Sequence, residues 1–419
     1  MKALVITLEQ PNRDPRIACS LEKLAQEYQT SLLVAQYAEN ADKIETYKKY
    51  PYIQGRKFST LIAAYLLAKF LALHALQIIY HPVIAFKIFK AIFARSSLKD
   101  FKNSLFKRDL TKFNPIPTAI LYMLLREKLP LKEKYDVIWC HEYISAFAGY
   151  VYKLHYPNAK IIWDEHEAGV FPDLIDLYKI INPKIDIFIS LNEPILAYQQ
   201  KLLKHPNAFI LPNAPLKKPH SKALPIKERL EFVIVGTLNI HMNLVLDSLI
   251  EAFSQFPEQA VLHLYLMRPI GTSEKNRDIS GLEFQNHAPN IIFHSPLLNQ
   301  EMLEKIKEYD VGICPYIFTN NYIGENSCAN KAGEYMHSGL AVMINQSMSW
   351  YGKKIIDFGC GFTYDGQSKD SLHQAINNLL KNPGKVQEMK ENSAKAAADF
   401  WNYDAFFDKL PLKKIPLDF

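Results

Sequence analysis

The sequence predicts an α/β protein built from two doubly wound domains, each a parallel β-sheet with helices on both faces. Two observations lead to this fold class. Short, almost wholly apolar segments alternate with helix-length segments along the 419 residues, and the alternation occurs in two successive series. Fully apolar strands between helices are typical of parallel sheets that are buried on both sides. A stretch rich in proline and lysine, residues 212–219, separates the two series.

The first series opens directly on an apolar strand and continues with a helix over residues 16–28. Its predicted strands are residues 3–8, 31–35, 137–140, 160–163, 185–190 and 209–211. No charged segment followed by a long apolar one precedes the first strand, so no cleaved signal peptide is expected. The five cysteines are scattered and form no Cys-x-x-Cys pair or Cys/His cluster. This pattern predicts a reducing, cytoplasmic compartment and no zinc site or disulfide framework.

The second series has the same rhythm, with a helix over residues 244–256. Its predicted strands are residues 232–235, 261–266, 291–293, 311–315, 341–344 and 361–364. We therefore expect an N-terminal domain over residues 1–215 and a C-terminal domain over residues 216–398. Residues 399–419 are expected to pack back on the first domain.

Residues 310–345 hold the clearest chemical signal. They read as an apolar strand, a polar loop, a short helix over about residues 330–338, a glycine cap at Gly339 and another apolar strand. The helix start carries Asn330, Lys331 and Glu334. Backbone N–H groups, the helix dipole and a lysine suit a phosphate. A glutamate one turn further can accept hydrogen bonds from a ribose diol, so the segment predicts a nucleoside diphosphate site.

The helix start also resembles the donor-site signature of retaining nucleotide-sugar glycosyltransferases of the GT-B fold, in particular glycosyltransferase family 4. Many members carry a pattern close to PNK-x-x-EYM-x-x-G-x-x-V, which stands here over residues 329–342. Six weaker matches to the family precede it along the chain, in the order in which the family has them. They lie at residues 14–16, 135–142, 164–167, 211–214, 233–237 and 310–316. The resemblance implies two Rossmann-like domains that face each other across a cleft.

The resemblance also implies roles for individual residues. Lys331 would bind the diphosphate, Glu334 the nucleotide ribose, and His166 would face the transferred sugar, so these three are the candidate catalytic residues. The candidate donor-binding residues are Gly236, Thr237, Arg268, Tyr316, Glu325, Asn326 and Asn330. The acceptor-side candidates are Asp14, Arg16 and His141.

Three positions depart from the family pattern. The family has two glutamates eight residues apart, whereas Asn326 stands eight residues before Glu334 and Glu325 is one position off. No Arg or Lys follows Gly236 closely, and Arg268 could replace that charge. The turn after the first strand contains no glycine. Because of these departures, a non-catalytic or scaffold protein on the same fold remains an alternative. A nucleotide-sugar epimerase on the same fold is another.

Residues 55–112 form a basic segment with eleven Lys or Arg and two acidic residues, in a chain whose net charge is +6. Aromatic and aliphatic residues are interleaved with the charges. Lys69 and His74 interrupt the apolar run at residues 61–79, which argues against a membrane-spanning helix. Basic amphipathic helices on an anionic membrane fit better. A packed helical pair with a solvated basic rim remains the alternative. Nucleic acid is not expected, because no nucleic-acid-binding motif appears.

The sequence thus predicts a retaining hexosyltransferase that uses a UDP- or GDP-sugar. The absence of an Asp-x-Asp motif, the metal-binding signature usual in the other large glycosyltransferase fold, favours metal-independent transfer. No cofactor is expected beyond the nucleotide sugar itself. The expected acceptor is a glycan or a lipid-linked molecule, and the expected place is the inner face of the cytoplasmic membrane, to which the protein binds peripherally.

Overall fold

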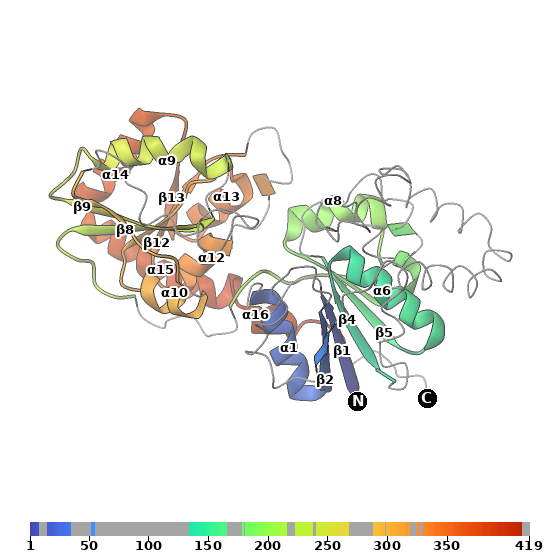
Figure 1. Cartoon of the computed structure of the whole chain (residues 1–419). Helices are drawn as coiled ribbons and strands as arrows, with labels where there is room; N and C mark the ends of the chain where they lie inside the picture. Colours follow the sequence, from blue (N-terminus) through green and yellow to red (C-terminus); the bar gives the residue numbers. More distant parts are fainter. Residues whose placement is uncertain are drawn as a thin grey trace, which may run out of the picture. The chain divides into compact units, whose positions relative to one another are not determined.

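A computed structural model describes most of both predicted domains. The described residues are 1–7, 15–34, 52–54, 134–165, 178–179, 181–215, 223–237, 240–267, 288–297, 299–318, 325–326 and 330–412. The basic segment at 55–112 lies outside them. The chain divides into two compact units, the first comprising Met1–Leu211 with the chain from Leu410 onward and the second Pro212–Lys409 (Figure 1). The boundary between the units after Leu211 lies four residues before the boundary that the sequence predicts after residue 215.

The first unit contains a seven-stranded parallel sheet in the order β3-β2-β1-β4-β5-β6-β7. Its strands are β1 (Lys2–Thr7), β2 (Gln29–Val34), β3 (Tyr52–Gln54), β4 (Val137–His141), β5 (Lys160–Asp164), β6 (Ile187–Ser190) and β7 (Ala208–Ile210). Its described helices are α1 (Pro15–Glu27), α6 (Glu142–His155), a 3-10 turn η4 (Asn182–Lys184) and α8 (Glu193–Leu203). The strand order reverses between β1 and β4.

The second unit contains a six-stranded parallel sheet in the order β10-β9-β8-β11-β12-β13. Its strands are β8 (Leu230–Thr237), β9 (Ala260–Met267), β10 (Ile291–Phe293), β11 (Val311–Cys314), β12 (Ala341–Asn345) and β13 (Gly361–Tyr364). Its described helices are α9 (Ile240–Phe253), α10 (Asn299–Ile306), α12 (Asn330–His337), α13 (Ser349–Asp357), α14 (Lys369–Lys381), α15 (Pro383–Phe400) and α16 (Tyr403–Phe407).

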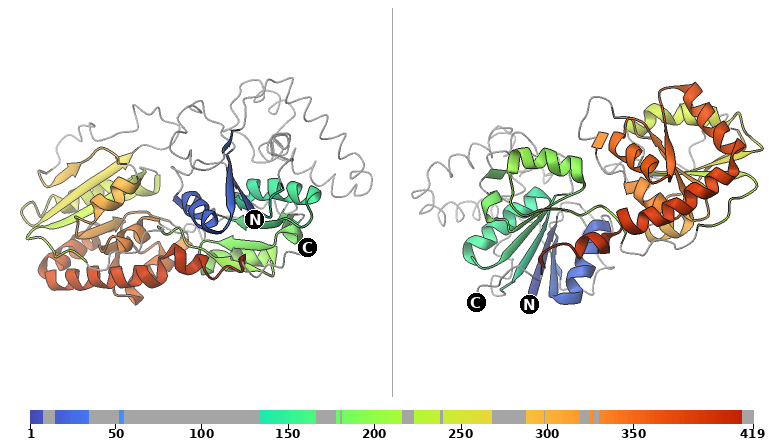
Figure 2. Two further views of the ribbon diagram at one scale, coloured as in Figure 1. Left: turned by 90° about the horizontal axis from the view of Figure 1, so that it is seen from below. Right: turned by 180° about the vertical axis from the view of Figure 1, so that it is seen from behind.

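Helices cover both faces of the second sheet. Helices α9 and α14 pack together on one face, while α12 and α15 pack together on the other (Figures 1 and 2). The central strands β11 and β12 are buried along their whole length. The predicted fold class, two doubly wound parallel α/β domains, is therefore confirmed. Within the part of the chain that the structure describes, no helix has the length and apolar character that crossing a bilayer requires.

A buried ion pair fixes the entry of β11 into the second sheet. The Asp310 carboxylate accepts hydrogen bonds from the Lys390 ammonium of α15 at 2.7 Å and from the Glu231 backbone N–H at 3.1 Å. The side chains of Asp310 and Lys390 are each 1% exposed. A buried charge is tolerated only when it is paired and hydrogen-bonded. The aspartate that precedes β11 thus joins three segments, the starts of β8 and β11 and helix α15.

Candidate nucleotide site

The strand order of the second sheet reverses between β8 and β11. In open parallel sheets, ligands bind outside the carboxyl ends of the strands at such a reversal. Gly236 and Thr237 end β8 there, and Tyr316 follows β11 by two residues. Helix α12 starts from the same edge, because it joins the carboxyl end of β11 to the start of β12. The candidate donor residues that the structure describes therefore belong to one edge of one sheet.

Helix α12 has a well-defined end that fixes its length. The Leu340 N–H bonds the Tyr335 carbonyl at 3.0 Å, and the Gly339 N–H bonds the Met336 carbonyl at 3.0 Å. Gly339 has φ +74°. This is the Schellman ending, in which a glycine takes the left-handed conformation at little cost. The helix covers residues 330–337, one residue shorter than predicted.

Two glycines let helix α12 lie close to its neighbours. A Cβ atom on Gly312 would stand 2.2 Å from the Tyr335 ring, and one on Gly333 would stand 1.8 Å from the Trp401 indole. The Tyr335 hydroxyl accepts a hydrogen bond from the Val235 N–H at 3.0 Å. Tyr335 thus links α12 to β11 by contact and to the end of β8 by a hydrogen bond. These contacts orient the helix before any ligand arrives.

Lys331 and Glu334 form an ion pair on this helix. The Lys331 Nζ donates to the Glu334 Oε2 at 2.6 Å, and the side chains are 22% and 8% exposed. Both belong to the helix that the Tyr335 hydrogen bond and the Gly333–Trp401 contact hold in place. The pair offers a cation that can meet a phosphate and a carboxylate that can accept hydroxyl hydrogen bonds. The structure thus places two of the three predicted catalytic residues side by side.

Of the other donor candidates, the structure describes all except Arg268. Gly236 has φ +153°, a conformation that favours glycine. Burial raises the pKa of the Tyr316 phenol, which therefore stays neutral, and its negative neighbour Glu334 acts in the same direction. Asn330 Oδ1 accepts a hydrogen bond from Asn213 Nδ2 at 3.0 Å. Thr237 is half-buried at the end of β8, and Glu325 and Asn326 are both half-buried in the short described piece before α12.

Three predicted site residues lie outside the described residues: Asp14, His166 and Arg268. Their roles stay predictions from the resemblance. The shifted glutamate spacing also stays open, because only two residues of the loop between residues 319 and 329 are described.

The acceptor-side candidates Arg16 and His141 are buried in one polar network at the strand reversal of the first sheet. The Arg16 guanidinium forms a bidentate ion pair with Asp164, in which Nε donates at 3.1 Å. His141 Nδ1 lies 3.4 Å from the same carboxylate, and Trp139 Nε1 donates to it at 3.0 Å. Arg16 Nη1 also donates to the carbonyl of Leu211, where the chain leaves the first unit, at 2.6 Å.

Asp164 is the centre of this network, and it is not among the predicted site residues. It belongs to the motif at residues 164–167, in which only His166 is predicted to face the sugar. Arg16 is 2% exposed and Asp164 is fully buried. Arg16 and Asp164 therefore hold three segments together: the end of β4, the end of β5 and the chain at Leu211. A contact of Arg16 or His141 with the acceptor stays a prediction.

The same network contains a serine, a histidine and an aspartate connected as in a Ser–His–Asp triad. Ser20 Oγ lies 2.7 Å from His141 Nε2, and His141 Nδ1 lies 3.4 Å from Asp164. The geometry alone would suggest a hydrolase. However, Ser20 is 0% exposed, and its hydroxyl also lies 2.9 Å from the Ile17 carbonyl of its own helix. A nucleophile must reach the substrate, so this cluster is a structural network.

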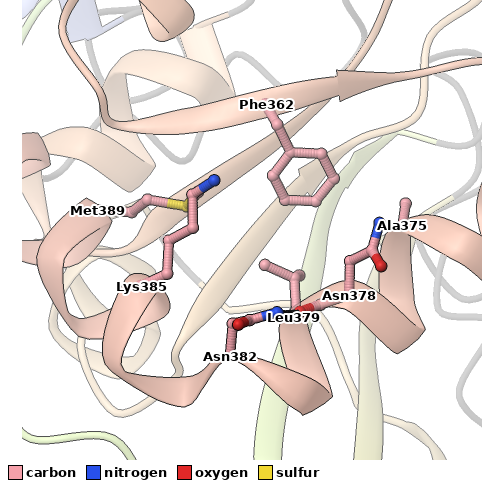
Figure 3. Close-up of a pocket in the computed structure, with 7 residues that line it drawn as sticks. All are labelled: Phe362, Ala375, Asn378, Leu379, Asn382, Lys385 and Met389. Carbon is pink, nitrogen blue, oxygen red and sulfur yellow. Dashed lines mark hydrogen bonds between the residues drawn. The ribbon is translucent and has the colours of Figure 1, made fainter.

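A separate cavity of about 280 Å³ lies between β13, α14 and α15 (Figure 3). Its lining residues are Phe362, Ala375, Asn378, Leu379, Asn382, Lys385 and Met389. No predicted site residue is among them. Within the described residues, no three His, Cys, Asp or Glu side chains gather as a metal-ligand set.

Two doubly wound parallel α/β units in succession are the architecture of the GT-B fold. The sucrose-phosphate synthase of Thermosynechococcus elongatus superposes with a TM-score of 0.65, at 15% identity over 99% of this chain and 98% of that one. The HepE protein of Anabaena, solved in complex with UDP, gives 0.60 at 13% identity over 99% of both chains. These likenesses confirm the predicted GT-B resemblance at the level of the fold.

A Listeria monocytogenes structure with the name of a UDP-N-acetylglucosamine 2-epimerase shares the fold too. Its TM-score is 0.53 at 12% identity, over 99% of this chain and 95% of that one. No protein-family model and no curated protein sequence matches the chain. The assignment to glycosyltransferase family 4 therefore stays a prediction.

Proposed function

We propose that this protein is a glycosyltransferase that moves a hexose, with retention of configuration, from a UDP- or GDP-sugar to a glycan or lipid-linked acceptor. The observation that carries the proposal is the Lys331–Glu334 pair on α12, at the strand reversal of a GT-B donor-type sheet. The UDP complex of HepE, a neighbour in fold, supports a uridine nucleotide as one donor component. The transfer proceeds without a bound metal in this proposal.

The chemistry of the reaction gives the pair its roles. Breaking the bond between the sugar and the diphosphate builds negative charge on the leaving group, which preorganised cations and N–H donors stabilise. Lys331 and the first N–H groups of α12 supply that charge. When the diphosphate draws Lys331 away, the carboxylate of Glu334 becomes available to the two ribose hydroxyls. On binding, Lys331 and Glu334 thus give up their mutual hydrogen bond, and each of them bonds a different part of the nucleotide.

An epimerase is the second candidate, because one fold neighbour carries that name. A non-catalytic sugar-binding protein is the third, because the glutamate spacing departs from the family pattern. A transferase releases the nucleoside diphosphate and forms a new glycosidic bond only when an acceptor is present. An epimerase changes the sugar without an acceptor, and a binding protein leaves the nucleotide sugar intact.

Calorimetric titration of UDP and GDP into the protein in excess EDTA tests the donor site. We expect binding of at least one nucleotide under these conditions. Binding that appears only after Mg²⁺ or Mn²⁺ is added would contradict the metal-independent proposal. NMR of the reaction with a panel of UDP- and GDP-sugars then distinguishes transfer, epimerisation and simple binding, and the anomeric coupling of the product reports retention.

A further inference from the structure

Three hydrogen bonds hold the turn at the end of β12, residues 345–348. The Asn345 side-chain oxygen accepts from the Ser347 N–H at 3.0 Å, and the Asn345 carbonyl accepts from the Met348 N–H at 3.0 Å. The Gln346 N–H continues the sheet by bonding the Tyr364 carbonyl at 2.9 Å. Asn345 and Met348 are buried. The turn is thus a rigid support beside the carboxyl edge of β11.

The hydroxyl of Ser347 bonds the chain that leaves β11. Its Oγ accepts from the Phe318 N–H at 2.9 Å and donates to the Tyr316 carbonyl at 3.3 Å. A hydroxyl has one proton and two lone pairs, so it can make both bonds at once. The two bonded backbone groups are two residues apart, on either side of Ile317.

This pattern continues the β11–β12 ladder beyond its last backbone pair. The register pairs Val311 with Ala341 and Cys314 with Ile344, so the same register extended by three residues would pair Ile317 with Ser347. In a parallel ladder, one residue donates to the carbonyl before its partner and accepts from the N–H after it. The Ser347 hydroxyl does both in place of the backbone. Pro315 has no N–H, and the backbone ladder stops before it.

The extension fixes where three side chains lie. Ile317 is 4% exposed and belongs to the core of the unit, while the rings of Tyr316 and Phe318 stack with their centroids 6.4 Å apart. Alternate residues of an extended chain point to opposite faces. Holding residues 316–318 extended therefore places two aromatic rings together at the donor edge, with Tyr316 near the carboxylate of Glu334.

We propose that Ser347 is a positioning residue of the nucleotide site, whose hydroxyl holds the Tyr316–Phe318 segment in its binding geometry. This inference rests on the proposed function for the identity of the ligand. The hydrogen bonds of Ser347 rest on the structure alone. Because Ser347 acts through the backbone of its neighbours, its loss should weaken nucleotide binding while the unit stays folded.

The test compares Ser347→Ala, which removes the hydroxyl, with Ser347→Thr, which keeps it. Ser254→Ala is the matched control, because Ser254 bonds one backbone carbonyl, that of Ile250, at the far end of α9. Two readouts are needed: the Kd for UDP and GDP by calorimetry, and hydrogen–deuterium exchange of the peptide that covers residues 315–318. The thermal midpoint of each variant establishes that it is folded.

We expect Ser347→Ala, which removes both hydrogen bonds of the hydroxyl, to raise the Kd on the order of fivefold and to speed exchange at 315–318. Ser347→Thr and Ser254→Ala should behave as the wild type in both readouts. A folded Ser347→Ala protein with wild-type Kd and wild-type exchange would overturn the proposal. If Ser347→Ala does not fold, Ser347→Cys takes its place, and equal Kd values for the Cys and Thr variants overturn it.

The proposed function and the role of Ser347 can be contradicted separately. If the wild-type protein binds neither UDP nor GDP, the proposed function fails, and the exchange measurement then decides whether Ser347 holds the segment. If the wild type binds a nucleotide and the Ala variant binds it equally well, only the role of Ser347 fails.

Discussion

At the scale of single residues, the proposed donor site depends on two side chains that neutralise each other. Lys331 and Glu334 pair at 2.6 Å on helix α12, where Glu334 is buried and Lys331 is partly exposed. Removing Lys331 leaves the buried carboxylate without its cation, which costs stability. Removing Glu334 leaves a partly exposed lysine, which water can solvate. Function and stability should therefore separate more clearly at Glu334 than at Lys331.

The first prediction concerns this pair. Lys331→Ala and Glu334→Ala should each weaken UDP or GDP binding by roughly 1.5–3 kcal/mol, the range for hydrogen bonds to charged groups. Both variants should stay folded, with the thermal midpoint of Glu334→Ala nearer to that of the wild type. Lys369→Ala is the control, because it breaks an exposed ion pair with Glu251 in the same unit. Unchanged nucleotide affinity in both variants would show that the motif was misread.

The second prediction compares two glycines in helices. Gly333→Ala places a Cβ 1.8 Å from the Trp401 indole, whereas Gly384→Ala meets nothing within 4 Å. Both changes gain helix propensity, up to about 1 kcal/mol. Overpacking at Gly333 should still destabilise the protein by about 1–3 kcal/mol, while Gly384→Ala stabilises it slightly. Urea unfolding of the two variants measures the difference, and equal free energies of unfolding would contradict the close packing.

At the scale of elements, the buried pair between Asp310 and Lys390 ties α15 to the start of β11. Removing one partner leaves the other charge buried without its counter-ion. Lys390→Ala should therefore destabilise the second unit by roughly 3–5 kcal/mol. Lys305→Ala, which breaks an exposed pair with Glu308, should change the free energy of unfolding little. Denaturant unfolding monitors both, and a small effect of Lys390→Ala would show that the pair is dispensable.

The strands of both sheets could be predicted because their signal is local. The apolar run at 311–315 predicted β11, and the structure ends the strand at Cys314 because Pro315 lacks an N–H for the ladder. The helix with Lys331 and Glu334 was predicted to within one residue for the same reason, since its glycine cap stands next to it in sequence. Strand β3 was missed, because three residues at a sheet edge carry too little periodicity.

The contacts that shape the sites could not be read from the sequence, because they join distant segments. Arg16 and Asp164 are 148 residues apart, and nothing local marks them as partners. The same holds for Gly333 and Trp401. The role of Ser347 depends on the register between β11 and β12, which a single sequence does not specify. The sequence thus predicts which groups carry chemistry, and the fold supplies what holds them.

At the scale of the whole molecule, both units contain groups whose pKa is lowered on folding. Burial lowers the pKa of His205 in the first unit and of His294 in the second, where electrostatic interactions with His263 and Lys305 lower it further. A hydrogen bond from His263 lowers the pKa of Glu231. In each case the folded state binds fewer protons than the unfolded chain at mildly acidic pH. The free energy of unfolding should therefore fall as pH drops.

The fourth prediction follows from this fall in the free energy of unfolding at lower pH. The histidine contribution is present above about pH 6.5, the value of an unperturbed histidine, and is lost as pH falls through the lowered folded values. The glutamate contribution is lost at lower pH still. Thermal midpoints measured from pH 8 to pH 5 should decrease on acidification, with a shallower decrease for His294→Gln. A protein that becomes more stable on acidification would contradict the assignment.

The fifth prediction concerns the basic segment 55–112, which lies outside the described residues. Its eleven basic and two acidic residues predict binding to anionic membranes, at about 1 kcal/mol per Lys or Arg near the surface. Flotation with liposomes should show binding to anionic vesicles at low salt, little binding to neutral ones, and release by high salt. Equal binding to both vesicles would reject the electrostatic model. No binding to either would favour a packed helical pair with a solvated basic face.

The packing of Trp401 against helix α12 has a practical consequence. Its indole is 1% exposed and touches Gly333, and its N–H has no hydrogen-bond partner among the described residues. An indole in such dry surroundings emits at short wavelength, and its quantum yield responds to small movements of nearby charges. Lys331 lies two positions from the contacted glycine and Glu334 lies next to it. The protein therefore carries its own optical probe, and the emission of Trp401 should change when a nucleotide separates these two charges.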